Sequence, residues 1–470
     1  MADKSDRLTF YGGSIGRYLP LIAALVFVAI AAINQAKIDG YVIAFFAGNV
    51  IGLVFAKDQR KYSEAVINGL SKPMFSIIAL AVIFAAVSGA LVSNSGVIQT
   101  LAAYVVKAGL TERYFVGATF ILACLISFST GTSVGTYFVV APILYPVGCL
   151  VGADPAFMIG SIVAGGAFGD NLAPISDTTI ASSQTQGMDI GGVVRTRTQY
   201  SIPVAVIALI LYLSIGPTGE KVLQSDVIEQ VTAQVNPLSL LMLVVPVVII
   251  ALCLVRKHLI TALSYGVLSG IVVSLIFGIY KPADLLSFPA PFAIEGIIPN
   301  GIMGCLATIA MLLMIFPLLG IMEANGVISD MAASIGRLAK SRKAAEFSIF
   351  LSTGILSMIT GVISVAILAV GEFANKVGKK FNIHGYRRAN LLDCTGIAFC
   401  FIVPWTVHAI VPAMLTSNID MPGVTAVQPH VIPFHNFYSW VMLLMLIFAI
   451  VTGYGSKVEV QQAETTTTAG

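Results

Sequence analysis

Charged residues are scarce in this sequence. Only 10% of its 470 residues are Asp, Glu, Lys or Arg, whereas about a quarter of the residues of soluble domains carry charge. Hydrophobic residues make up 57%, and the mean hydropathy is +0.92. These values exclude a soluble globular protein and indicate a membrane protein. The net charge of +3 gives no electrostatic surface for nucleic acid.

Cysteine and histidine are also few. The six cysteines include no C-x-x-C pair, and all lie within or beside apolar stretches. This pattern argues against a disulfide framework or a zinc site, and no cofactor is expected. The cysteines are predicted to be small core residues: Cys124, Cys149, Cys253, Cys305, Cys394 and Cys400.

What the sequence does contain is apolar runs long enough to cross a bilayer, which needs about 20 residues per helix. Two runs, 114–152 and 344–378, are too long for one helix and have a polar or glycine-bearing centre, which predicts re-entrant hairpins. The other runs predict ten spans: 18–36, 40–56, 73–94, 155–182, 198–216, 237–255, 259–280, 297–322, 389–416 and 436–454.

The positions of the basic residues test this count. With the N-terminus inside, 21 of the 26 Lys and Arg residues fall in the segments predicted to face the cytoplasm. We therefore expect an all-α polytopic protein of the cytoplasmic membrane, with about ten spans plus two hairpins and with both termini cytoplasmic.

The two halves of the chain resemble each other at an offset of 230 residues. Ser95–Gly148 align with Asn325–Gly378 without a gap, with 12 identities in 54 positions. Each unit holds five crossings, an odd number, so the second copy should be inverted. The expected organisation is a first repeat at 1–216, an external connector at 217–236, a second repeat at 237–454 and a disordered cytoplasmic tail at 455–470. Each repeat contains a hairpin (114–152 or 344–378) and a broken helix (155–182 or 389–416).

Inverted repeats with broken helices are typical of secondary transporters, because two opposed half-sites at mid-membrane can be exposed to either side in turn. Hydroxyls and glycines gather at the predicted hairpin tips, where they could replace the hydration shell of a small cation. The alternative is that the hydroxyls bond back to helix carbonyls. The candidates are Ser129, Thr130, Gly131, Thr132 and Ser133 in the first hairpin, and Thr360 and Gly361 in the second.

The run 165–179 interrupts an apolar helix with two acids and Pro174. Carboxylates within the membrane usually mark an ion path, although an Asp beside a helix break can also serve as a cap. Asp177 is the preferred candidate, and replacing it with Asn is expected to abolish coupled transport. Further candidates are Asp170, Asn171, Ser176, Thr178 and Thr179, and the predicted sodium ligands are Asp177, Thr130, Ser133 and Thr178.

These motifs resemble a known family. Gly-Asp-Asn-Leu-Ala-Pro-Ile-Ser-Asp-Thr-Thr at 169–179, together with the Thr-Gly hairpin and Asp393…Pro404-Trp405, is similar to the NhaC-type sodium/proton antiporter family of the ion transporter superfamily. The resemblance implies two hairpins and two broken helices that move against a scaffold in cation-coupled exchange. Relatives also exchange organic solutes, such as malate for lactate, or carry amino acids. The family places an acid before Asp393 and an Asn after Pro-Trp, where this chain has Leu392 and Thr406.

The second half adds further candidates. Asp393 lies five residues after Arg388, so it could be a mouth anchor paired with a basic neighbour. His408 could titrate or bind a substrate carboxylate, and it could equally be a helix-packing histidine. Glu372 is expected to pair with Lys376 four residues on. Thr406 and His408 are taken to shape the rest of the site.

The function favoured by the sequence is secondary active sodium/proton antiport by alternating access, with sodium and protons as the transported ions. The rival is coupled transport or exchange of an amino acid or carboxylate. Gly131–Gly135 fits G-x-S-x-G, so an intramembrane serine hydrolase is a remote alternative. Such an enzyme, however, has no use for an inverted copy of its scaffold. A channel is similarly disfavoured. The expected partners are the ion, a possible organic solute and the lipid bilayer, and a homodimer is left open.

Overall fold

The computed structural model describes residues 7–215, 235–327, 330 and 340–456, apart from 35, 37, 109, 110, 256 and 420. The predicted connector at 217–236 lies outside the described residues except for its last two. The predicted tail at 455–470 lies outside them except for residues 455 and 456. Three of the repeat identities, at 328, 332 and 333, also lie outside them.

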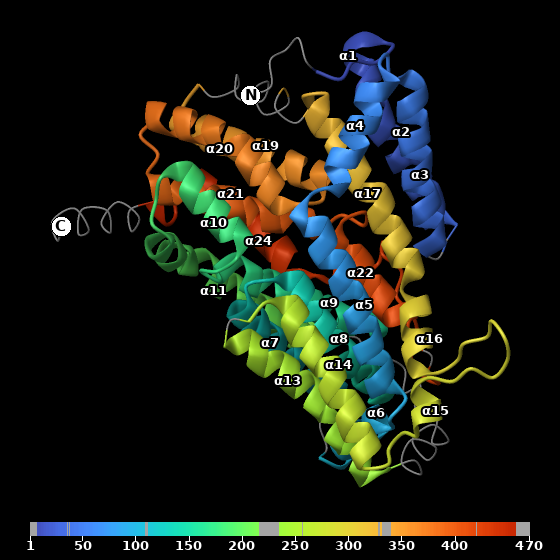
Figure 1. Cartoon of the computed structure of the whole chain (residues 1–470). Coiled ribbons are helices and arrows are strands. Elements are labelled where there is room, and N and C mark those ends of the chain that lie inside the picture. Colours follow the sequence, from blue (N-terminus) through green and yellow to red (C-terminus); the bar gives the residue numbers. More distant parts are fainter. Residues whose placement is uncertain are drawn as a thin grey trace.

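The described chain is built from helices (Figure 1). Those of the first half are α1 (Gly13–Gly16), α2 (Leu19–Ile33), α3 (Ile38–Phe55), α4 (Gln59–Leu70), α5 (Pro73–Ser93), α6 (Val97–Lys107), α7 (Glu112–Thr130), α8 (Ser133–Leu150), α9 (Pro155–Leu172), α10 (Asp177–Gln186) and α11 (Ile190–Ile215).

The second half begins with a short 3-10 helix. Its elements are η2 (Pro237–Leu243), α13 (Val244–Leu254), α14 (Leu259–Ile276), α15 (Pro282–Leu285), α16 (Ile297–Gly304), α17 (Leu306–Ala324), α19 (Arg342–Thr360), α20 (Ile363–Lys380), α21 (Gly385–Cys400), α22 (Val407–Ser417), α23 (Ile432–His435) and α24 (Phe437–Thr452).

Seven helical segments in the described part of the chain are long and apolar enough to cross a membrane, and five shorter apolar helices accompany them. The protein is therefore an all-helical polytopic membrane protein. Two helices, α4 and α6, fall in segments that the sequence analysis left as connections, because their 12 and 11 residues are fewer than the roughly 20 that a span needs.

Two helical hairpins lie at the predicted positions. Gly131 joins α7 to α8 with φ 69°, and Gly361 joins α19 to α20 with φ 65°. Both are left-handed C-caps, a conformation that glycine adopts without a steric penalty. The helices of the second hairpin have the same bounds as those of the first, shifted by 230 residues. Figure 1 shows the second hairpin in the upper part of the molecule and the first in the lower part.

Each hairpin is followed by a broken helix. The first break, 173–176, contains Pro174, which cannot donate a backbone hydrogen bond, and the second, 401–406, contains Pro404. The short helices after the breaks cross between the halves. α10 packs on α20 and α21 of the second half, and α22 packs on α8 and α9 of the first.

Helices α2, α3, α4 and α17 lie together on the right of the view in Figure 1, whereas α11 lies on the left. α17 packs on α3 and α4, while α5 packs on α14 and α16. Charges from segments predicted to be cytoplasmic meet here. Lys72 contacts Glu323 at 2.5 Å, and Asp330 accepts from Arg7 at 2.9 Å and from Arg17 at 2.5 Å. Burial raises the pKa of Asp330, but the hydrogen bonds from the two arginines outweigh it and hold that pKa below its ordinary value.

Candidate ion-binding site

A polar cavity lies where the two hairpins and the two breaks meet. Its volume is about 80 Å³. Its lining residues come from both halves of the chain, including α5 of the first and α14 of the second: Ile77, Ile78, Ala81, Thr132, Ser133, Val134, Asp170, Asp177, Thr178, Leu259, Gly361, Val362, Ile363, Ser364, Val407 and His408.

Asp170 is the buried carboxylate of this cavity. One of its oxygens accepts a hydrogen bond of 2.8 Å from the Ser133 hydroxyl, and the other accepts one of 2.6 Å from Ser176. Gly169 lets α9 approach the first hairpin closely, because a Cβ there would lie 2.2 Å from the Phe128 nitrogen. The carboxylate is therefore fixed between the hairpin tip and the break.

Asp177 lies at the first position of α10, and its side chain is exposed to the cavity. No hydrogen bond or ion pair joins it to any other residue in the described part of the chain. Beside it, the Thr178 hydroxyl lies 3.0 Å from that of Ser176. Carboxylate and hydroxyl oxygens are the ligands that a hard cation prefers, so Asp170, Asp177 and Thr178 could hold one here.

His408 reaches the same cavity from α22. Its Nδ1 lies 3.4 Å from both the Ser133 hydroxyl and the Tyr137 hydroxyl. The ring is stacked on Phe401, with centroids 3.8 Å apart. Ser133 thus connects the histidine of the second half to the carboxylate of the first.

Other predicted hydroxyls bond to their own chain. Ser129 donates to the Leu125 carbonyl at 2.8 Å, and Thr360 donates to the Leu356 carbonyl at 2.7 Å. The Thr130 hydroxyl lies 3.4 Å from two carbonyls of its own hairpin. At these three positions the alternative of back-bonding describes the structure. Gly131 lies in contact with the first break, because a Cβ there would meet Ile175.

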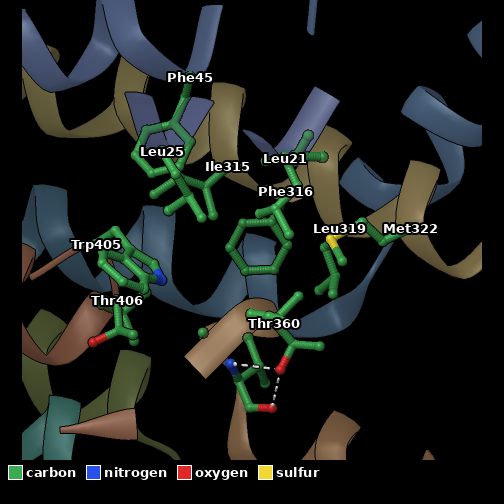
Figure 2. Close-up of a pocket in the computed structure, with 15 residues that line it drawn as sticks. Leu21, Leu25, Phe45, Ile315, Phe316, Leu319, Met322, Thr360, Trp405 and Thr406 are labelled. Carbon is green, nitrogen blue, oxygen red and sulfur yellow. Dashed lines mark hydrogen bonds between the residues drawn. The ribbon is translucent and has the colours of Figure 1, made fainter. Parts of the chain in front are cut away.

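Thr360 and Thr406 line a second cavity of about 30 Å³ between the second hairpin, the second break and α2, α3 and α17. Figure 2 shows it surrounded by apolar side chains, including Phe45, Phe316 and Trp405. Thr406 donates to the Cys400 carbonyl at 2.9 Å. This cavity has no charged side chain in its lining.

Three predicted site residues belong to a buried network behind the polar cavity. Asp393 pairs with Arg197 at 2.8 Å rather than with Arg388, the neighbour suggested by spacing. Asn171 donates to Asp393 at 3.0 Å, and Thr179 accepts from Arg197 at 2.8 Å. Arg388 instead donates to Gln186 and to the Ile383 carbonyl.

The sequence analysis missed Arg197, Tyr137 and Ser364. Arg197 was counted only among the cytoplasmic charges, and its place directly before the charge-free run 198–216 was the signal available. It also missed the buried pair of Arg387 with Glu346, at 2.9 Å. The expected pair of Glu372 with Lys376 is confirmed, at 2.6 Å.

An all-helical polytopic protein with a polar cavity between two broken helices has the architecture of a membrane transporter. The chain belongs to the Na+/H+ antiporter family, whose model matches residues 11–217 and 220–451. It is an integral membrane protein, as the family's members are, and the resemblance seen in the sequence is confirmed.

Named relatives cover most of the chain. The Na(+)/H(+) antiporter NhaC of Alkalihalophilus pseudofirmus is 25% identical over 84% of this chain and 88% of its own length. The malate-2H(+)/Na(+)-lactate antiporter of Bacillus subtilis is 23% identical over 88% of both chains. The Na(+)/H(+) antiporter NhaC of Bacillus subtilis is 24% identical over 79% of this chain and 84% of its own.

Proposed function

We propose that this protein exchanges sodium for protons across the cytoplasmic membrane, with the site at Asp170. The observation that carries the proposal is a buried carboxylate that is held by two hydroxyls at a cavity bounded by both hairpins. A sodium ion and a proton compete for the same oxygens, so binding of one displaces the other. Exchange follows if the cavity opens to each side in turn.

Asp177, Thr178 and Ser133 would complete the sodium shell around Asp170. The sequence analysis ranked Asp177 first. The burial and the two hydrogen bonds of Asp170 favour Asp170 as the centre, with Asp177 as a second carboxylate at the mouth. His408 would contribute through Ser133.

We also propose that the transport unit consists of two inverted copies of one fold, in ten spans plus two hairpins, with both termini cytoplasmic. Support comes from the shared helix bounds at an offset of 230 residues and from the reciprocal packing of α10 and α22. Inverted copies give two related arrangements of similar energy, which alternating access requires.

The test is reconstitution into liposomes with an imposed sodium gradient and a pH-sensitive dye inside. Sodium-driven movement of protons with no organic solute present is the expected result. Asp170→Asn and Asp177→Asn are compared with Ser129→Ala, whose hydroxyl bonds only within its own helix. Proton movement that is unchanged in Asp170→Asn would refute the assignment.

A second candidate is exchange that includes an organic carboxylate. The cavity's empty space exceeds the volume of a bare ion, and apolar side chains such as Ile77 and Val134 line part of it. One relative is named as a malate-2H(+)/Na(+)-lactate antiporter. Proton movement that appears only when malate or lactate is supplied would favour this candidate.

A further inference from the structure

A buried ion pair lies outside the cavity that binds the ion in our proposal. Arg197 on α11 and Asp393 on α21 are both fully buried and lie 2.8 Å apart. No part of the exchange reaction described above uses this pair.

Arg197 donates to both sides of the first break. Nη1 donates to the Asn171 carbonyl at 2.5 Å, in the last turn of α9, and to the Thr179 hydroxyl at 2.8 Å, in the first turn of α10. Nη2 donates to Ser182 at 3.3 Å. The guanidinium therefore bridges the two pieces of the broken helix.

The other contacts tie this bridge to the second half of the chain. Arg197 Nε donates to the Asn390 side chain at 3.2 Å, and Asp393 accepts from Asn171 at 3.0 Å. All three guanidinium nitrogens thus have partners. A positive charge at the carboxyl end of α9 also interacts favourably with the negative end of that helix's dipole.

We propose that Arg197 is a positioning residue for the Asp170 site, with Asp393 as its charge partner. Asn171 is the next residue after Asp170, and Thr179 follows Ser176 by three positions. By holding Asn171 and Thr179 together, the guanidinium fixes how far Ser176 lies from Asp170. This inference rests on the proposed function.

Stability alone is a weak reason for such a pair. Taking two charges out of water costs about as much as their attraction returns, and apolar residues of similar size often replace a buried pair without loss. The contacts are also specific to a planar fork. A lysine would place one point charge near Asp393 and would leave several of the acceptors without a donor.

The test compares two double variants that each replace a buried pair with apolar residues. Arg197→Met with Asp393→Leu removes the bridge, and Arg387→Met with Glu346→Leu removes a buried pair that lies away from the cavity. We expect both proteins to remain folded by thermal unfolding. Only the first should raise the half-saturating sodium concentration, by at least about tenfold, and should shift the pH profile of exchange.

Arg197→Lys should raise the half-saturating sodium concentration by an intermediate amount. Guanidinium ion, added below denaturing concentrations, should partly restore the sodium affinity of Arg197→Gly but not that of Arg197→Met. Equal sodium affinity and pH profile in the two double variants would overturn the proposal. If the wild-type protein moves protons only with malate or lactate, sodium/proton antiport fails. The same comparison, made on the half-saturating concentration of that solute, then still decides the role of Arg197.

A second, independent feature is the loop between α15 and α16. It projects sideways from the bundle (Figure 1). Ser287 and Glu295 pair through two backbone hydrogen bonds, of 2.8 and 3.0 Å, which close it into a small hairpin. Its tip, 288–294, carries no charge; Phe288 is 71% exposed and Phe292 is fully exposed.

The size of this tip argues against a contact with a second copy of the chain. Two aromatic side chains bury about 150–250 Å² each, well short of the roughly 800 Å² per partner in a stable interface. The helices that follow the loop, α16 and α17, also carry exposed apolar side chains, such as Met303 and Leu306. Those helices form one of the membrane-spanning candidates.

We infer that this loop inserts its aromatic tip into the headgroup region of the bilayer beside the outer ends of α14 and α16. Phe side chains of interfacial segments are buried at the boundary between headgroups and acyl chains, and the charges of the loop, Lys281, Asp284 and Glu295, lie at its base. The loop would fix the depth of this end of the scaffold.

A nitroxide spin label at Phe292→Cys tests this in vesicles of phosphatidylethanolamine and phosphatidylglycerol, with Asp284→Cys as the control. Signal from the native cysteines is subtracted with the unsubstituted protein. We expect the label at 292 to be more accessible to oxygen and less accessible to a water-soluble nickel chelate than the label at 284. Equal nickel accessibility would place the tip in water, and dipolar broadening between labels would indicate a second copy; either result overturns the inference.

Discussion

The hairpin and the broken helix of each half have corresponding positions in the chain, but their chemistry differs. The first half has Asp170, Asp177 and Ser133, and the residues 230 positions later are Cys400, Val407 and Ile363. The helix bounds and the hairpin glycines correspond closely. The comparison shows that the two halves share their helix bounds in these segments, while the carboxyl and hydroxyl groups at these three positions lie in the first half.

The largest difference is expected between Asp170→Asn and Cys400→Ser. Loss of the carboxylate should reduce sodium-driven proton movement by about 100-fold or more, since charged hydrogen-bonded groups contribute roughly 1.5–3 kcal/mol per bond. The cysteine change should alter it less than about twofold, since both side chains are small. Dye-based exchange rates in liposomes measure both, and a comparable loss in Cys400→Ser would break the contrast.

Ser133→Ala and Ser364→Ala sharpen the contrast between the hairpin tips. Ser133 donates to Asp170 at 2.8 Å, while Ser364 lines the cavity from the second hairpin. Losing a hydrogen bond to a carboxylate should raise the half-saturating sodium concentration about tenfold or more. Ser364→Ala should raise it less than about threefold. If Ser364→Ala had the larger effect, the second hairpin would have to supply a ligand.

Gly131→Ala and Gly361→Ala test how strongly the backbone conformation of each hairpin tip depends on glycine. Both glycines have positive φ, so alanine should cost about 1–2 kcal/mol in either position. At Gly131 the new methyl would also lie 2.5 Å from Ile175, whereas at Gly361 the nearest atom is 3.7 Å away, on Thr406. Thermal unfolding in detergent should therefore show the greater loss for Gly131→Ala; an equal loss would mean that Ile175 moves aside freely.

The smallest effect is expected away from both cavities, where the loop before α11 meets α21. The Tyr386 hydroxyl and the Gly192 amide donate to Asp189, and these bonds lower the pKa of Asp189. A lowered pKa in the folded state stabilises the fold above the unfolded value of about 3.9, and this contribution disappears as the pH falls through the folded value.

Tyr386→Phe should therefore reduce stability near pH 6 by less than about 1 kcal/mol, because Asp189 is largely exposed to water. Unfolding of the variant and of the wild type should converge at pH 2–3. A difference that is the same at pH 6 and pH 2 would show that the tyrosine acts through packing instead.

Much of the fold could be predicted from the sequence because membrane helices can be recognised by their length and hydropathy. The break at Thr360-Gly361 and the one around Pro174 were located within a residue or two, since glycine and proline act locally. The amphipathic helices α4 and α6 are too short to be found by a search for membrane spans.

The candidate site was harder to predict from the sequence. Asp170 and Asp177 are seven residues apart, and the break between them hides which one points into the packed interior. The partner of Asp393 is Arg197, 196 positions earlier, and no local spacing in the sequence indicates so distant a pair. Back-bonding of Ser129 and Thr360 depends on side-chain rotamers that the sequence does not specify.

The crossing of α10 and α22 between the halves has a consequence for biosynthesis. When α11 leaves the ribosome, Asp393 and α20 do not yet exist, so Arg197 has no counter-ion and α10 has no surface to pack on. A guanidinium without its partner is costly in lipid. Arg197 of the nascent amino-terminal portion therefore reaches its counter-ion only after translation has passed residue 393.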